Sequence, residues 1–163
     1  MRIEQVLADS AATEALGGVL ARVLAGGGVV YLRGDLGAGK TTLVRGLLRA
    51  LGVAGAVRSP TYTLLEIYEL SGRPPILHMD LYRLHDPEEL VAIGVRDFSP
   101  ERSLWLVEWP ERGEGFLPAP NVCVDLSDAG HGRRACLQSD DAGLMAELCA
   151  QLGTSAPADS SPS

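Results

Sequence analysis

The sequence predicts an α/β fold around a mostly parallel β-sheet, with helices on both faces and a β-hairpin near the C-terminus. Three observations predict it. Short apolar runs alternate with amphipathic helical patterns, glycine-rich turns separate them, and the last two apolar runs have no helix between them. Residues 1–152 are expected to form a single domain, and the polar, proline-bearing residues 153–163 a disordered tail.

The chain begins with an amphipathic helix expected over residues 10–25, with Ser10 as its N-cap and three glycines at 26–28 to end it. Apolar residues recur at helical spacing at Leu16, Val19, Leu20, Val23 and Leu24. The apolar run "VVYL" at 29–32 is predicted to be a short strand. A second helix is expected after the glycine-rich turn that follows this strand, and Gly52 ends it.

Strands and helices also alternate in the rest of the chain. Residues 53–70 are predicted to be a loop that leads into a strand. Asp86 is expected to open a helix as its N-cap, with Pro87 at the first position and Glu89 as the capping-box partner. Two buried strands are predicted at 74–80 and 103–109. A hairpin is predicted from 121–126 and 133–138, and a short helix at 141–151.

Composition excludes several classes of protein. With a net charge of −7, the chain lacks the positive field that non-specific nucleic-acid binding requires. It also has no run of 18 apolar residues, so no membrane span is predicted. The N-terminus carries acids and no continuous apolar stretch, so a signal peptide is not expected. The three cysteines are isolated and the three histidines form no spaced ligand set, which favours a reducing cytoplasm and argues against zinc.

The strongest motif is a glycine-rich turn, "GDLGAGKT", between the strand at 29–32 and the next helix. It matches G-x-x-x-x-G-K-[ST] as Gly34, Gly39, Lys40 and Thr41, and Lys40 is the only lysine beside 13 arginines. Such glycines let backbone N–H groups surround a phosphate, and the helix directs its positive N-terminus at the same anion. The compact ammonium of a lysine reaches the β- and γ-phosphates, and a threonine hydroxyl binds Mg²⁺. The motif predicts a P-loop NTPase-like sheet.

Two carboxylates end predicted strands and are candidates for the chemistry of a bound nucleotide. Glu108 closes "LWLVE" and Asp80 closes "ILHMD", and both are expected at the edge of the sheet where ligands gather. We assign Glu108 to Mg²⁺, directly or through water, and Asp80 to the attacking water or to the outer shell of the metal. These two roles can be exchanged on sequence grounds alone.

Other polar residues give weaker predictions. In the loop "RSPTYT", Thr61 is the candidate sensor of a γ-phosphate, with Ser59 behind it, although an ordinary proline turn explains this loop equally well. Trp109 follows Glu108 and fits the core or an interface better than a nucleotide-stacking position. Arg133 or Arg134 could reach a nucleotide from the hairpin, although a solvated face suits their spacing. Without a second lysine there is no N-K-x-D guanine reader, which favours ATP over GTP.

Several motifs together resemble the TsaE (YjeE) family over about residues 10 to 138. They are, in chain order, "GDLGAGKTT", "SPTYTL", "HMDLYRL", "DPEELVAIGVRD" and "LVEWPERGEGFLP". The resemblance implies a small Mg²⁺-dependent ATPase needed for N6-threonylcarbamoyladenosine (t6A) at tRNA position 37, with weak activity that partners raise. It also implies action on the TsaD–TsaB complex, so that tRNA is met only indirectly.

The resemblance also assigns roles to matching positions. It implies that Lys40, Asp80 and Glu108 serve catalysis, that Thr41 and Glu108 hold Mg²⁺, and that Asp80 acts in hydrolysis. The nucleotide contacts that it implies are Ser10, Gly37, Ala38, Gly39, Lys40, Thr41, Thr42, Thr61, Trp109 and Arg133. Two other functions remain open at this point: a P-loop kinase of small molecules, and a nucleotide-gated binding module without significant hydrolysis.

Overall fold

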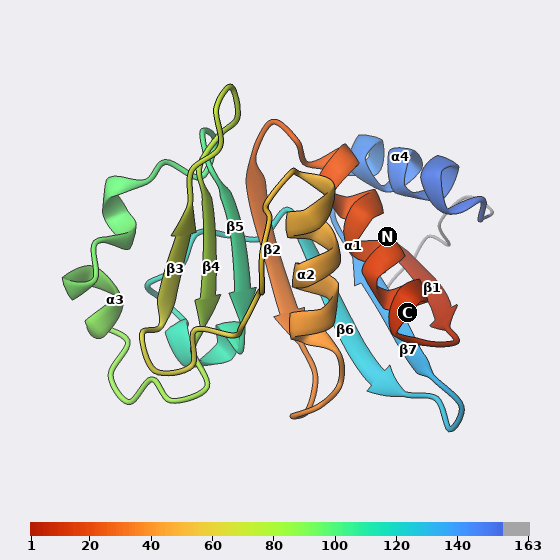
Figure 1. The fold of residues 1–163 in the computed structure, drawn as a ribbon, viewed down its shortest axis with the longest axis horizontal. Coiled ribbons are helices and arrows are strands. Elements are labelled where there is room, and N and C mark those ends of the chain that lie inside the picture. The colour runs from red at the N-terminus through yellow and green to blue at the C-terminus, as the bar shows by residue number, and fades with distance from the viewer. Residues whose placement is uncertain (155–163) are drawn as a thin grey trace.

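A computed structural model describes residues 1–154 of the chain as a seven-stranded sheet with helices packed against it (Figure 1). The strand order is β1-β7-β6-β2-β5-β4-β3. The strands are β1 Arg2–Leu7, β2 Gly28–Arg33, β3 Leu65–Tyr68, β4 Ile76–Asp80, β5 Leu104–Glu108, β6 Val122–Asp128 and β7 Arg133–Gln138. The helices are α1 Ser10–Val23, α2 Lys40–Ala50, α3 Glu89–Ala92 and α4 Ala142–Leu152, with 3₁₀ turns η1 Val95–Asp97 and η2 Pro110–Gly113.

The sheet is mixed, so the prediction of a mostly parallel sheet is wrong. Parallel pairing is confined to the centre, where β2 lies between β5 and β6 and β4 adds to β5. The pairs β3–β4, β6–β7 and β1–β7 are antiparallel. Two of these arise because short turns join β3 to β4 and β6 to β7, and a short turn can only return the chain antiparallel. The third arises from β1, a strand that the sequence analysis did not predict.

The two faces of the sheet are covered differently, with longer helices on one face and only the single-turn α3 and two 3₁₀ turns on the other. Helices α1, α2 and α4 share one apolar core with the strands, and Figure 1 shows α1 and α2 lying over β2, β6 and β7. The opposite face packs against the short α3, η1 and η2 and the irregular chain between them. Residues 81–118 contain no helix longer than α3, so loops rather than long helices close this side.

Two helix starts differ from prediction. Asp9, not Ser10, caps α1, because its carboxylate accepts a hydrogen bond from the Ala12 N–H at 2.8 Å. The Asp86 carboxylate accepts from the Glu88 N–H at 3.0 Å, but this closes only a turn. Helix α3 starts at Glu89 without a side-chain cap and is a single turn long.

The C-terminal helix α4 ends as its sequence suggests. Gly153 adopts a left-handed conformation and the Thr154 N–H donates to the Cys149 carbonyl at 3.1 Å. Gly153 and Thr154, the first two residues of the predicted tail, thus belong to the end of α4, and its remaining residues, 155–163, lie outside the described residues. Within the part of the chain that the structure describes, none of the helices has the length and apolar character needed to cross a membrane.

Helices α1 and α2 approach closely through glycine, which gives a testable stability prediction. A Cβ on Gly17 would lie 2.2 Å from the Leu43 carbonyl oxygen, whereas one on the adjacent Gly18 would meet nothing closer than 3.8 Å. Gly17→Ala is expected to lower the free energy of unfolding by about 3 kcal/mol, because backbone must move apart. Gly18→Ala is the control and should stabilise α1 by up to about 1 kcal/mol. Urea denaturation measures both, and equal midpoints would contradict the prediction.

Candidate functional site

The predicted site residues meet where three parallel strands end. In the register of the sheet, Glu108 of β5 lies between Leu32 of β2 and Asp80 of β4. The side chains of a strand alternate between its two faces, so the last residues of β4 and β5 point to the same side as α2. This places both carboxylates beside the loop that connects β2 to α2.

The loop at 34–39 is shaped by glycine. Gly39 precedes α2 with φ 106° and provides no side-chain cap, so the first N–H groups of this helix face the loop. Gly34 has φ 147°, and a Cβ there would lie 2.5 Å from the Leu126 carbonyl oxygen. A larger residue at either position would open the loop, because L side chains rarely adopt these angles. The geometry is that of an anion-binding turn at a helix N-terminus.

Lys40 is buried in this loop, with 5% of its surface exposed. Its Nζ donates to the Gly34 carbonyl and, at 2.9 Å, to the Asp35 carbonyl. The same nitrogen lies 4.5 Å from the centre of the Trp109 ring, within range of a cation–π contact. Burial lowers the pKa of Lys40, and the nearby Glu108 and Asp80 carboxylates partly restore it. A bound anion would place a further negative charge beside this ammonium.

The two carboxylates are buried and linked by hydroxyl groups. Glu108 is 2% exposed and Asp80 5%. The Thr41 hydroxyl donates to Glu108 Oε1 at 3.2 Å, and the Thr61 hydroxyl donates to Asp80 Oδ2 at 3.0 Å. The Ser59 hydroxyl contacts both acids, donating to Asp80 Oδ2 and lying 3.4 Å from Glu108 Oε2. The loop with Ser59 and Thr61 is therefore hydrogen-bonded to the carboxylates.

Trp109 follows Glu108 in a strained backbone conformation. Its φ of 58° is in the left-handed region, which a bulky side chain rarely adopts. The ring packs against Tyr82 with centroids 5.1 Å apart, and Lys40 Nζ lies over the ring. This bend takes the chain out of the sheet directly after Glu108 and leads into η2. Trp109 therefore lines the site cavity beside Lys40, where the resemblance to the TsaE family placed it.

A cavity of about 260 Å³ unites most of the predicted residues. The candidate site residues that line it are Gly37, Ala38, Gly39, Lys40, Thr41, Thr42, Thr61, Asp80, Glu108 and Trp109, with Ser59. Ser10 and Arg133 line a second cavity of about 220 Å³ instead, together with Asp9 and Thr13. Gly37, Gly39 and Thr42 belong to both cavities, so the two lie on adjoining sides of the same loop. All twelve predicted site positions therefore surround the glycine-rich loop.

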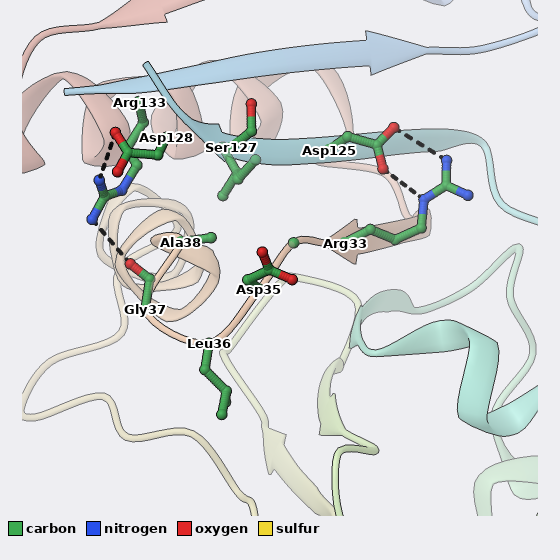
Figure 2. Close-up of a pocket in the computed structure, with 11 residues that line it drawn as sticks. Arg33, Asp35, Leu36, Gly37, Ala38, Asp125, Ser127, Asp128 and Arg133 are labelled. Atoms are coloured by element: carbon green, nitrogen blue, oxygen red, sulfur yellow. Dashed lines mark hydrogen bonds and ion pairs between the residues drawn. The ribbon is translucent and has the colours of Figure 1, made fainter. Parts of the chain in front are cut away.

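Arg133 braces the loop rather than pointing freely into solvent. Its Nη2 donates to the Gly37 carbonyl at 3.0 Å, and its Nη1 lies 4.0 Å from the Asp128 carboxylate (Figure 2). The cavity in Figure 2 is larger, about 500 Å³, and runs along residues 33–38 and the end of β6. Its Arg33 and Asp125 form a half-exposed ion pair at 2.8 Å. We take the cavity of about 260 Å³ as the site, because Lys40 and the two buried carboxylates line it and line neither of the other two.

The sequence analysis missed His78, which is fully buried beside Glu108. Its Nε2 lies 2.6 Å from Glu108 Oε2. The available signal was the spacing in "HMD", since residues two apart on a strand share a face and so His78 lies on the face of Asp80. The contact to Glu108 depends on how β4 and β5 align, and this register is not readable from either strand alone.

The oxygen groups at the site suit Mg²⁺ better than a softer metal. Thr41, Asp80 and Glu108 provide a hydroxyl and two carboxylates, and Mg²⁺ is bound through one or two carboxylates, several waters and substrate phosphates. Within residues 1–154 there is no group of three or more His, Cys, Asp or Glu side chains placed to hold a metal by themselves. These residues fit an ion that arrives with a phosphate.

These features define a class: a mixed α/β protein with a glycine-rich anion loop, one buried lysine and two buried carboxylates at the ends of parallel strands. The family model "Threonylcarbamoyl adenosine biosynthesis protein TsaE" matches residues 7–136, and the chain belongs to this TsaE family. That result confirms the resemblance deduced from the motifs.

Individual relatives agree with this membership. A protein of Haemophilus influenzae named tRNA threonylcarbamoyladenosine biosynthesis protein TsaE is 54% identical over 98 residues, which cover 60% of this chain and 61% of that protein. The Bacillus subtilis protein of the same name is 34% identical over 140 residues, covering 86% of this chain and 87% of the relative. A crystal structure of YdiB from Bacillus subtilis superposes with a TM-score of 0.75 at 27% identity, covering 94% of this chain and 95% of that one.

Proposed function

We propose that this chain binds and hydrolyses ATP with Mg²⁺ in the cytoplasm, as a component of the t6A system that acts on the TsaD–TsaB complex. One observation carries the ATPase proposal: the only lysine of the chain and two buried carboxylates line one cavity at a glycine-rich helix N-terminus. The names of the relatives support the place in t6A formation. The net charge of −7 supports contact with tRNA through partner proteins rather than directly.

In the proposed mechanism, one group of residues binds the phosphates and another holds Mg²⁺ and orients the attacking water. Backbone N–H groups from Gly37 to Thr42 and the Lys40 ammonium would hold the β- and γ-phosphates. The Thr41 hydroxyl and Glu108 would hold Mg²⁺, which supplies positive charge to the phosphate oxygens when bound. Asp80 would orient the attacking water, and Thr61 would carry the state of the γ-phosphate to the loop around it.

The geometry favours this division of roles over its exchange. Glu108 Oε1 lies beside the Thr41 hydroxyl at the start of α2, where a P-loop threonine meets its metal. Asp80 instead contacts Ser59 and Thr61 of the loop, and its Oδ1 accepts from the Tyr82 N–H at 3.0 Å. Asp80 is thus hydrogen-bonded to the loop that would cover a γ-phosphate, whereas Glu108 is hydrogen-bonded to the first turn of α2.

A direct assay tests the proposed activity. The purified chain is incubated with Mg²⁺ and γ-labelled ATP, alone and with TsaD and TsaB, and the label is followed into free phosphate. The expected result is slow phosphate release that the partners raise and that EDTA stops. Label in a phosphorylated metabolite, when a metabolite pool is added, would indicate a kinase instead. Nucleotide binding without any release would indicate a nucleotide-gated module.

Trp109 offers an optical test of where the nucleotide binds. Its ring lines the cavity beside Lys40, whereas Trp105 is buried in the core with its Nε1 donating to the Ser103 hydroxyl at 2.8 Å. ATP addition is expected to change the intrinsic fluorescence, because charge would arrive next to one indole only. Trp109→Phe should remove most of this change and Trp105→Phe should keep it. A signal that follows Trp105 would place the nucleotide elsewhere.

A further inference from the structure

His78 is a buried histidine with one partner. It occupies the middle of β4 and has no exposed surface. One ring nitrogen, Nε2, lies 2.6 Å from Glu108 Oε2, while Nδ1 is buried without a hydrogen-bond partner among the described residues. A buried polar ring on a strand of apolar neighbours requires an explanation, since an apolar residue would pack there at lower cost.

The sheet register brings this ring to Glu108. His78 of β4 is opposite Leu106 of β5, and Glu108 is two residues further along the same strand. Residues two apart share a face, so the imidazole and the carboxylate are diagonal neighbours on the side of α2. The contact therefore follows from the central parallel pairing and not from a flexible loop.

The surroundings determine which nitrogen carries the proton. An ionised carboxylate only accepts hydrogen bonds, so the contact to Glu108 requires an N–H on Nε2. The ring thus acts as a single rigid donor aimed at one oxygen of Glu108.

We propose that His78 is a positioning residue that fixes Glu108 for Mg²⁺; this rests on the proposed ATPase function. Its N–H occupies Oε2, with the Ser59 hydroxyl 3.4 Å from the same oxygen. Oε1 is thereby left toward the Thr41 hydroxyl, on the side where the metal would bind. Partners of this kind set the orientation of a metal carboxylate, and their loss typically costs about 10–100-fold in metal affinity.

Two substitutions separate the hydrogen bond from packing. His78→Leu removes the donor at similar size, and His78→Gln offers an amide N–H that can reach Glu108. Met79→Leu is the matched control, because Met79 is also buried in β4 but points to the opposite core. The measurement is the Mg²⁺ concentration that half-saturates the fluorescence of a methylanthraniloyl-ATP complex, with nucleotide affinity in EDTA recorded alongside.

His78→Leu is expected to raise the Mg²⁺ requirement about 10-fold or more and leave affinity in EDTA unchanged. His78→Gln should restore most of the loss, and Met79→Leu should match wild type. A wild-type Mg²⁺ requirement in His78→Leu, or no recovery in His78→Gln, would overturn the role of His78. A wild-type chain that binds no nucleotide would instead overturn the proposed function beneath it.

A measurement on the unmodified chain covers the case in which His78→Leu does not fold. The ¹⁵N chemical shifts of the His78 ring distinguish a protonated nitrogen from a bare one. The proposal expects a protonated Nε2, with and without Mg²⁺–nucleotide. A bare Nε2 would mean that no hydrogen bond to Glu108 exists, and the proposal would fall.

Discussion

Replacing Lys40 with alanine is expected to weaken ATP binding about 100-fold, which corresponds to about 3 kcal/mol. Lys40 is 5% exposed, so its ammonium meets a phosphate without a further large desolvation cost. It also lies between the loop carbonyls of Gly34 and Asp35 and the carboxylates of Asp80 and Glu108. Without it, a triphosphate would approach two buried negative charges with only backbone N–H groups to attract it.

The measurement is titration with fluorescent ATP at fixed Mg²⁺ and fixed salt. Arg49→Ala is the matched control, because it removes one positive charge from the same helix at an exposed position that pairs with Glu14. Its affinity should be within about twofold of wild type, since exposed pairs contribute little. Lys40→Arg tests shape: the charge remains but the planar guanidinium does not fit the loop, so binding should stay weak. Equal ATP affinity for Lys40→Ala and wild type would mean that Lys40 does not contribute to phosphate binding.

The local features of the site could be predicted from the sequence because each depends on a short pattern. The spacing of Gly34, Gly39 and Lys40 specifies a turn between a strand and a helix, and the structure has that turn. Apolar runs that end in an acid predicted where Asp80 and Glu108 would lie, and parallel register confirms that they are neighbours. Periodicity likewise predicted α1 and α2 within a few residues.

What could not be predicted depends on pairing between distant segments. Strand β1 was missed because the polarity of "RIEQVL" does not alternate: the apolar Val6 is 66% exposed, and the polar Gln5 shares a face with the buried Ile3 and Leu7. Its place beside β7 is set by hydrogen bonds to a strand over 100 residues away, and this pairing adds a third antiparallel pair to the sheet. His78 escaped notice for the same reason, since its only described partner is on another strand. Adjacent caps such as Asp9 and Ser10 are also indistinguishable by type, as both residues favour that position.

Replacing Glu108 with alanine is expected to reduce ATP turnover about 100-fold or more while changing ATP affinity far less. The contrast follows from the contacts of the carboxylate: it meets the side chains of Thr41, Ser59 and His78, whereas the proposed phosphate contacts are backbone N–H groups and Lys40. An Mg²⁺ ion contributes several kcal/mol of charge stabilisation as phosphate is transferred, and each 1.36 kcal/mol is about tenfold in rate. Under the proposed mechanism, ATP binding depends mainly on Lys40 and the backbone N–H groups, which this substitution leaves in place.

Single-turnover phosphate release and fluorescent ATP binding, measured on the same preparation, separate the two effects of Glu108→Ala. Glu111→Ala is the control, since it removes a nearby acid that is exposed in η2 and should leave both quantities near wild type. If Glu108→Ala hydrolysed ATP at the wild-type rate, the metal would have to be held from the other side of the site. Asp80 is the acid placed to do so, because it is next to Glu108 across the β4–β5 pairing. The combined substitution of both acids would then be needed to stop turnover, whereas under the proposed mechanism either one suffices.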